Sequence, residues 1–311
     1  MKHFFVVNPA SGDGKRYKSL IDDIHRLCGE MKLDYEVRLT EYSGHARWLV
    51  RTALSENKDI RFYACGGDGT VNEVACGLAE GQGGELAIIP VGTGNDFVRS
   101  FSPSGDYLSL EDQLSGESMS VDLVSAGDTT FLNMLNVGFD SAVVKTIASL
   151  RDKSRLMRGR FAYILGVIIN FFKLPKTTLR CVLDNGEIVE GKFLLSAFAN
   201  GKYYGGGFKA ASDAELDDGL LNLIFVRPCS RFVFLSLIGA YKKGTLLECE
   251  AAKKYVISKR CRSLSVTFSQ ESAVCIDGEL SNEHTFDIEV LPRALNLSLP
   301  SAERRVELEI N

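Results

Sequence analysis

Three glycine-rich polar segments in the first hundred residues each follow an apolar run. They are Asn8-Pro9-Ala10-Ser11-Gly12, Gly66-Gly67-Asp68-Gly69-Thr70-Val71-Asn72 and Pro90-Val91-Gly92-Thr93-Gly94-Asn95-Asp96. Glycine lets a phosphate approach the backbone, and amides at a following helix start offer it donors and partial positive charge. A carboxylate in such a loop, as at Asp68, suits a metal ion or a transferable proton. One segment alone could be a capped tight turn, but three together favour nucleotide phosphate binding.

The elements that must position these loops alternate between strand and helix patterns over residues 1–100. Residues 15–31 show apolar positions at a helical period, Ser43 is a plausible N-cap for a helix over 44–56, and 71–79 also favours a helix. This alternation predicts a parallel sheet with right-handed crossovers. Ligands bind at the carboxyl edge of such a sheet.

Strand patterns follow one another from about residue 118 onward. We predict strands over 121–124, 130–136, 178–183, 192–199, 220–226, 263–268, 273–276 and 286–291, with helices over 142–150, 159–172 and 230–242. Asp184-Asn185-Gly186 is a strong hairpin signal. The polar segment 100–116 is a sensible linker. The pattern predicts two domains, residues 1–117 and 118–311, the second antiparallel and β-rich.

Composition excludes some classes of function. The chain has 311 residues and a net charge of −4, which does not favour nucleic acid as a partner. Its eight cysteines form no C-x-x-C pair, which favours reduced, buried thiols. The longest apolar stretch, 161–172, is too short to span a membrane, and no signal peptide is evident. We therefore expect a cytoplasmic protein.

The motifs NPASGDGK, GGDGTVNEV and PVGTGNDF, in this order, resemble the diacylglycerol kinase catalytic domain. They are most similar to bacterial soluble lipid kinases of the diacylglycerol and sphingosine kinase superfamily. ELDDGLL and CIDGE match two further motifs, so the resemblance spans nearly the whole chain. NAD kinases share GGDGT, but its combination with GTGNDF is specific to lipid kinases. No Walker A sequence is present.

The resemblance implies an α/β ATP-binding domain with a mainly parallel sheet over 1–117. It implies a β-sandwich-like lipid-substrate domain over 118–311, with the active site in the interdomain cleft. In the family the extreme C-terminus can pack back on the first domain. The residues implied to hold ATP are Asn8, Pro9, Ala10, Ser11, Gly12, Thr40, Gly66, Gly67, Asp68, Gly69, Thr70, Val71, Asn72 and Thr93.

The resemblance also implies magnesium. Asp68 would hold a catalytic Mg²⁺ through water, because Mg²⁺ keeps several waters and uses few carboxylates. Asp122 and Asp96 are further candidates, although Asp122 could be an exposed strand carboxylate and Asp96 a loop brace. A structural Mg²⁺ would take the carboxylate of Asp218 and the carbonyls of Glu215 and Leu220, with an ordinary Asp-Gly turn as the alternative.

The resemblance also implies that Lys15 and Arg99 neutralise phosphate charge, because the family has a basic residue near each of these positions. The family often has its lysine directly after the Ser-Gly pair. Here Asp13 and Gly14 intervene, so a solvated lysine at a helix start is the alternative for Lys15.

The segment Cys275-Ile276-Asp277-Gly278-Glu279 is the second chemical centre. If a strand continues through it, its two carboxylates at i and i+2 lie on one side. The family places its general base here, so Asp277 and Glu279 are both candidates to accept the proton of the lipid hydroxyl. A glycine turn with two exposed acids is the alternative.

Cations precede the apolar stretch 161–172, namely Arg151, Lys153, Arg155, Arg158 and Arg160. Basic residues beside apolar ones favour contact with an anionic membrane, while a solvated loop before a core helix is the alternative. The loop Gly205-Gly206-Gly207 could border the lipid pocket.

The function expected from the resemblance is ATP-dependent transfer of the γ-phosphate to a lipid hydroxyl. Diacylglycerol, giving phosphatidic acid, is the leading acceptor. The alternatives are an NAD kinase-like enzyme and a non-catalytic nucleotide sensor. The expected partners are a lipid alcohol and, transiently, the inner face of the membrane, with homodimerisation left open.

Overall fold

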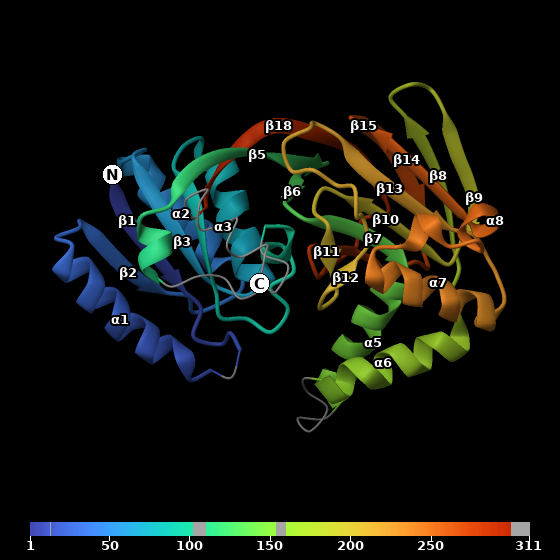
Figure 1. Cartoon of the computed structure of the whole chain (residues 1–311), viewed down its shortest axis with the longest axis horizontal. Coiled ribbons are helices and arrows are strands. Elements are labelled where there is room, and N and C mark those ends of the chain that lie inside the picture. The colour runs from blue at the N-terminus through green and yellow to red at the C-terminus, as the bar shows by residue number, and fades with distance from the viewer. Residues whose placement is uncertain (13, 102–109, 154–159, 300–311) are drawn as a thin grey trace. The chain divides into compact units, whose positions relative to one another are not determined.

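The computed structural model describes residues 1–12, 14–101, 110–153 and 160–299, and the side chains of 151–153 and 160–162 are not among the described groups. The chain forms two units (Figure 1), one comprising Met1–Leu123 with Leu291–Asn311 and the other Val124–Val290. Two strands contribute residues to both units, β5 (Glu117–Ala126) and β18 (Thr285–Leu299).

A parallel sheet organises the first unit. Its order is β2 (Tyr35–Leu39), β1 (Lys2–Val7), β3 (Ile60–Gly66) and β4 (Glu85–Pro90). In the parallel register Val7 is opposite both Leu39 and Cys65, and Gly66 is opposite Pro90. The four strands therefore end at one edge, as the alternating pattern predicted. Leu297 of β18 adds a parallel contact beside Leu86 of β4.

Helices cover this sheet (Figure 1). They are α1 (Arg16–Glu30), α2 (His45–Glu56), α3 (Asp68–Gly81) and α4 (Leu110–Leu114), with a short 3-10 turn η1 (Val98–Ser100). Buried residues of α1, such as Leu27, pack with Phe5 and Tyr63 of the sheet. Phe4 and Phe62 alternate with these and are also buried, so they face the opposite side of the sheet.

The start of α2 differs from the prediction. Ser43 is not the N-cap; Gly44 holds that position with φ of 87° and no side-chain cap. The carboxylate of Glu73, on α3, accepts the backbone N–H groups of Gly44 at 2.8 Å and Ala46 at 3.0 Å. A carboxylate is stabilising at a helix N-terminus because it satisfies free amides and complements the helix dipole. Glu73, which directly follows the second glycine segment, thus stabilises the start of α2.

The second unit is an antiparallel β structure, which confirms the expected fold class. Six strands form one sheet, in the order β14 (Val256–Cys261), β13 (Leu221–Val226), β10 (Leu195–Ala199), β7 (Met134–Gly138), β16 (Val274–Ile276) and β17 (Glu279–Ser281). The first part of β18 pairs with β15 (Ser263–Phe268), which pairs with β8 (Thr177–Leu183), and β8 pairs with β9 (Ile188–Phe193). Short strands β6 (Thr129–Phe131), β11 (Tyr203–Tyr204) and β12 (Phe208–Lys209) complete the described strands.

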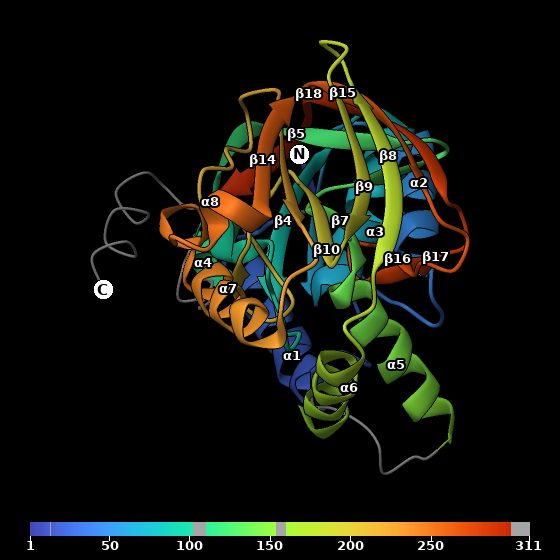
Figure 2. The same ribbon diagram turned by 90° about the vertical axis from the view of Figure 1, so that its right-hand side faces the viewer.

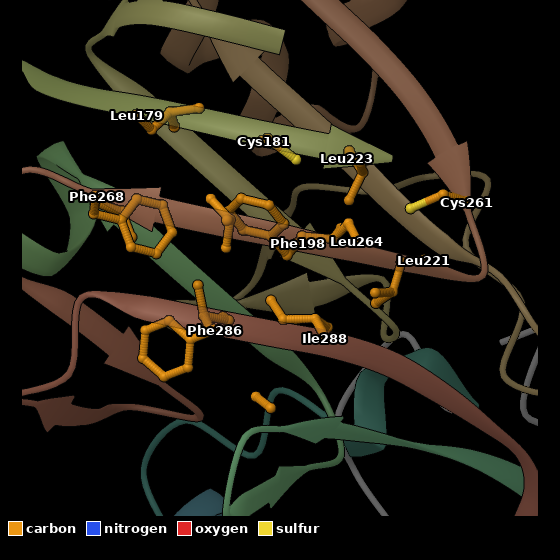
Figure 3. Close-up of a cluster of buried hydrophobic side chains, with 14 of the residues drawn as sticks. Leu179, Cys181, Phe198, Leu221, Leu223, Cys261, Leu264, Phe268, Phe286 and Ile288 are labelled. Atoms are coloured by element: carbon orange, nitrogen blue, oxygen red, sulfur yellow. The ribbon is translucent and has the colours of Figure 1, made fainter. Parts of the chain in front are cut away.

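The core of this unit lies between side chains of the two layers (Figure 3). Phe198 of β10 packs edge-on against Phe268 of β15, with ring centroids 5.9 Å apart. Leu179 and Cys181 of β8 belong to the same buried cluster as Leu223 of β13. Interdigitation of two inner faces is the packing of a β-sandwich.

Three longer helices lie in the second unit close to their predicted positions, α5 (Phe139–Lys153), α6 (Arg160–Lys173) and α7 (Arg231–Lys243); α8 (Ala252–Tyr255) and a 3-10 turn η2 (Leu246–Glu248) are short. The side chain of Ser230 caps α7 by accepting the Val233 amide at 3.4 Å. The predicted hairpin at Asp184-Asn185-Gly186 joins β8 to β9, and Gly186 has φ of 82°.

Two predicted strands are each divided in the structure. The segment 130–136 forms β6 and β7, because the amides of residues 132–134 donate to a distant carboxylate. The segment 192–199 forms β9 and β10, which belong to different sheets. At the break, the Leu194 amide donates to the Val226 carbonyl at 2.8 Å, and the Leu194 carbonyl accepts the Phe139 amide at 2.8 Å.

Six of the eight cysteines are buried and two are half-buried. Among the described helices none is long and apolar enough to cross a membrane.

Candidate active site

The predicted ATP-binding residues of the first unit gather at the carboxyl edge of the parallel sheet. Asn8 follows β1, Thr40 follows β2, Gly67 follows β3, and Thr93 lies in the loop after β4. The Asn8 side chain links the loop after β1 to the first turn of α3, because Nδ2 donates to Thr70 Oγ1 at 3.0 Å. Its Oδ1 accepts the Ala10 amide within the same loop at 3.0 Å. The first helical turn after β3 begins at Asp68, so its amides face this edge.

Glycine is required at several points because neighbouring groups approach its Cα too closely for a side chain. A Cβ on Gly92 would lie 2.3 Å from Gly67 Cα, and one on Gly66 would lie 2.2 Å from Thr70 Oγ1. Gly12 has φ of 63°, and its Cβ would lie 2.5 Å from the Val91 carbonyl oxygen. The edge is therefore lined largely by peptide groups, which suits phosphate binding.

Asp68 lies at this edge as the first residue of α3. Its Oδ1 accepts the backbone amides of Asp96 at 2.7 Å and Phe97 at 3.2 Å. Burial raises the pKa of Asp68 although these amides act in the opposite direction. Its other oxygen faces Gly94, where a Cβ would lie 2.8 Å from Oδ2. This cradle beside an anionic oxygen fits a hydrated Mg²⁺, because hard oxygen donors suit that ion.

The other candidate groups of the first unit have protein partners. Asp96 is buried, and Arg99 Nε lies 3.8 Å from its Oδ1. Arg99 also donates to the Gly94 carbonyl at 3.4 Å, so it braces the third loop. Asp122 is fully buried and accepts the Arg293 amide at 2.8 Å. The alternative that Asp122 is an exposed strand carboxylate is therefore wrong. Lys15 is exposed just before α1.

The two acids of the second unit occupy different environments. Asp277 accepts the amides of Leu132 at 2.8 Å, Asn133 at 3.1 Å and Met134 at 2.7 Å. Glu279 is exposed at the start of β17, opposite Ile276.

The chain turns between these two acids. Asp277 and Gly278 have φ of 45° and 89°, which is typical of a two-residue hairpin turn. The hypothesis of a continuous strand with both carboxylates on one side is therefore wrong, and the turn alternative describes the backbone.

In the predicted structural magnesium loop, Asp218 forms an ion pair with an arginine of the protein. Asp218 Oδ1 accepts the Leu220 amide at 2.9 Å, and Oδ2 pairs with the Arg260 guanidinium. Within the described residues, no cluster of three or more acidic, His or Cys side chains could hold a metal. With Arg260 in this position the Asp218 charge is already balanced, so the residues do not fit Mg²⁺ as they stand.

Arg260 should therefore compete with Mg²⁺ for Asp218. We expect Mg²⁺, without nucleotide, to raise the Tm of Arg260→Gln more than that of the wild type, because the carboxylate is then unpaired. In Asp218→Asn, the part of the Mg²⁺-dependent rise in Tm that comes from this loop should be lost. Thermal unfolding over a Mg²⁺ titration measures this, and equal responses in all three proteins would remove Asp218 as a metal ligand.

A half-buried acid outside the predicted residues lies at the start of α5. The Tyr204 hydroxyl donates to Asp140 Oδ2, and the ring of Tyr204 contacts that of Tyr241 on α7 with centroids 5.9 Å apart. Burial raises the pKa of Asp140 to about 6, although the Tyr204 hydrogen bond lowers it. The only sequence signal was an acid directly after an apolar run.

Asp140 should make stability depend on pH. Because its pKa is raised on folding, the ionised form destabilises the fold, and stability falls as pH rises from about 4 through about 6. Asp140→Asn should flatten this slope, because an amide does not ionise in this pH range. The asparagine Oδ1 can still accept the Tyr204 hydrogen bond. The effect is at most about 3 kcal/mol. Urea unfolding at several pH values measures it, and an unchanged slope would contradict it.

Some predicted residues lie outside the described set. Asp13, Arg155 and Arg158 are not described, nor are the side chains of Arg151, Lys153 and Arg160. Gly205, Gly206 and Gly207 form the turn between β11 and β12, with φ of 61°, 83° and 100°.

Known proteins resemble both parts of the chain. Residues 2–126 match the family described as diacylglycerol kinase catalytic domain, and 133–299 match the YegS C-terminal NAD kinase beta sandwich-like domain. A Pseudomonas aeruginosa protein named probable lipid kinase YegS-like is 32% identical over 271 residues, covering 85% of this chain and 84% of the relative. A Staphylococcus carnosus diacylglycerol kinase is 25% identical over 305 residues, covering 97% and 96%.

Solved structures share the fold. A Bacillus anthracis str. Sterne protein superposes with a TM-score of 0.76 at 24% identity, covering 97% of this chain and 98% of the other. A second, described as a diacylglycerol kinase from the same strain, has a TM-score of 0.70 at 22% identity, covering 97% of both chains.

Proposed function

This chain belongs to the family of YegS-like and diacylglycerol lipid kinases, and we propose that it transfers the γ-phosphate of ATP to the hydroxyl of diacylglycerol. The resemblance inferred from the motifs is thereby confirmed at the level of the family. The identity of the acceptor, diacylglycerol, goes beyond the family assignment. Its support is the family description and the name of the Staphylococcus carnosus relative.

The observation that carries the proposal is the loop arrangement at the sheet edge of the first unit. Loops after four parallel strands present glycine backbone and the Asn8–Thr70 pair at one edge, beside the start of α3. Phosphoryl transfer depends mainly on positioning and on neutralising charge, so an edge of amide donors supplies what the triphosphate needs.

Asp68 is the proposed ligand of the catalytic Mg²⁺. When bound, the ion neutralises phosphate charge and orients the γ-phosphate for in-line attack. The chain contributes an anionic Oδ2 that faces Gly94, while Oδ1 is held in place by the amides of Asp96 and Phe97. Asp96 and Asp122 act as braces in this proposal, since each is buried against a protein partner.

Glu279 is the better supported candidate for the general base. A base needs an oxygen free to take the proton of the lipid hydroxyl. Both oxygens of Asp277 already accept amides from residues 132–134, whereas Glu279 is exposed. We propose that Asp277 positions the turn and that Glu279 takes the proton.

The test is a transfer assay with γ-labelled ATP and Mg²⁺ in mixed micelles. Diacylglycerol, a long-chain sphingoid base, phosphatidylglycerol and NAD are offered separately. Labelled phosphatidic acid from diacylglycerol at the highest kcat/KM is the expected result. Preferential labelling of NAD would replace the proposal with the NAD kinase alternative. Tight ATP binding with no transfer to any acceptor would favour the sensor alternative.

A further inference from the structure

Two helices in the second unit carry large apolar side chains that are exposed to solvent. On α6, Ile164, Ile168 and Phe172 recur every four residues and are 49%, 47% and 66% exposed. On α7, Phe232 is 87% and Leu235 is 58% exposed. A helix of a globular protein normally presents polar residues on this side. We refer to these five side chains as the outer apolar face.

The folded core does not use the outer apolar face. On the inner side of α6, Asn170 Nδ2 donates to Thr146 Oγ1 of α5 at 2.9 Å, and a Cβ on Gly166 would lie 3.2 Å from Ile147. The inner side of α7 buries Phe234, which clusters with Phe171 of α6. Both helices are therefore anchored by their other sides, and the apolar residues outside need another explanation.

The sequence segments that carry this face have charges of one sign. Lys173, Lys176 and Arg231 are exposed beside it. Residues 160–183 and 219–247, which include both helices, contain no Asp or Glu, although the whole chain has a net charge of −4. The surface therefore combines exposed apolar groups with a local excess of cations. That combination complements an anionic bilayer, where apolar side chains enter the acyl boundary and cations meet lipid phosphates.

The ends of the two helices are held together at this surface. Arg231 Nη2 donates to the Phe172 carbonyl at 2.7 Å. A hollow of about 930 Å³ opens beside them, and its lining includes Phe172, Lys173, Lys176, Arg231, Phe232 and Leu235. Figure 2 shows α6 and α7 at the end of the second unit opposite the β8–β9 hairpin. The Arg231–Phe172 hydrogen bond thus ties the end of α6 to the start of α7 at this surface.

We propose that the outer apolar face, together with Lys173, Lys176 and Arg231, docks the protein on an anionic lipid bilayer. The inference rests on the proposed function, because a lipid kinase must meet its acceptor at a membrane. It differs from the contact predicted through the cations of 151–160, because its cations are Lys173, Lys176 and Arg231. Apolar insertion fixes the orientation of the second unit, and the cations select anionic lipid.

Two double variants separate the contributions. Phe232→Ser with Leu235→Ser removes apolar contact, and Lys173→Glu with Lys176→Glu reverses two charges. The matched control is Ile188→Ser with Lys192→Glu on β9, an exposed apolar residue and an exposed cation on the opposite hairpin. Co-sedimentation with vesicles of phosphatidylcholine alone, or with phosphatidylglycerol added, gives a partition coefficient for each protein.

We expect the wild type to bind the anionic vesicles and to release them in high salt. The charge variant should lower the partition coefficient at least about 30-fold, and the apolar variant at least about tenfold. The control should behave as the wild type. Absence of wild-type binding to anionic vesicles, or equal binding by all four proteins, would overturn the docking surface. So would a loss of dimer mass in the apolar variant with vesicle binding intact, since the face would then join two copies.

A second assay separates this proposal from the proposed function. All variants should phosphorylate a dispersed short-chain diacylglycerol at the wild-type rate, because no vesicle is involved. Variants that lose vesicle binding while no protein phosphorylates any lipid would support the surface and contradict the function. If the wild type phosphorylates the lipid and every variant binds vesicles as the wild type does, the function is supported and the docking surface is contradicted.

Discussion

Replacing Asp68 with asparagine is expected to lower kcat by roughly 10³-fold or more while the fold is retained. Asparagine keeps an Oδ1 that can accept the amides of Asp96 and Phe97, at 2.7 and 3.2 Å in the wild type. What it loses is the negative charge of the oxygen that faces Gly94. The substitution therefore removes the proposed metal ligand and leaves the loop anchor in place.

The same variant should be no less stable than the wild type near neutral pH. Burial raises the pKa of Asp68, and a carboxyl whose pKa is raised on folding destabilises the fold once it ionises. This cost grows as pH rises through the folded-state pKa and is absent in asparagine. Without Mg²⁺ and nucleotide, the Tm of Asp68→Asn should equal or exceed that of the wild type. Such a gain in stability with a loss of activity is common at active sites.

Asp68→Ala is the matched comparison. Alanine removes the acceptor for both amides as well as the charge, so its Tm should fall below that of Asp68→Asn. The measurements are kcat, Tm and ATP Kd with and without Mg²⁺. ATP affinity should lose its Mg²⁺ dependence in both variants. If Asp68→Asn turns over at close to the wild-type rate with Mg²⁺, Asp68 is not the metal ligand.

The sheet and its polar edge could be predicted because the signals are local. An apolar run followed by glycine and a helical period identifies a strand, a loop and a helix within about 25 residues. The loops after β1, β3 and β4 carry such signals, and parallel strands bring their ends to one edge. Thr40 was placed by resemblance alone, and its position after β2 follows from the same register.

Contacts between residues far apart in the sequence could not be predicted in this way. Glu73 caps α2 from 27 to 29 positions away, so the nearby Ser43 was the wrong choice of cap. Asp277 interrupts the predicted strand 130–136 from as far as 145 positions away. The ion pair of Asp218 with Arg260 spans 42 positions. None of these partners alters the local period or composition.

The final strand was underestimated for a different reason. We predicted a strand over 286–291, whereas β18 continues through Pro292 to Leu299. Proline ends most strand patterns because it cannot donate a ladder hydrogen bond. Here Leu295, Leu297 and Leu299 resume the alternation and are buried.

Glu279→Gln should lower kcat by roughly 10²–10⁴-fold while ATP Kd and Tm stay close to wild type. The side chain is exposed, so its neutral isostere costs the fold little. ATP binding is assigned to the loops of the other unit and should be unaffected. A fall in kcat with unchanged ATP affinity would place Glu279 in the chemical step.

Asp277→Asn should behave differently, because this carboxylate accepts amides on both oxygens. The Nδ2 group of asparagine would face one or two of the donors from residues 132–134, leaving them unsatisfied at about 1–3 kcal/mol each. We expect a lower Tm, together with a lower kcat because the turn that carries Glu279 shifts. The loss of stability is the readout that a purely catalytic acid would not produce.

The pH profile of kcat decides which acid takes the proton. A general base gives an acid limb, because protonation of the base stops the reaction. That limb should vanish in Glu279→Gln and persist, at lower amplitude, in Asp277→Asn. The reverse pattern, with a stable Asp277→Asn that has lost the limb, would make Asp277 the base. If both variants keep the wild-type kcat, neither acid is catalytic and the phosphoryl acceptor must be activated by a group outside this turn.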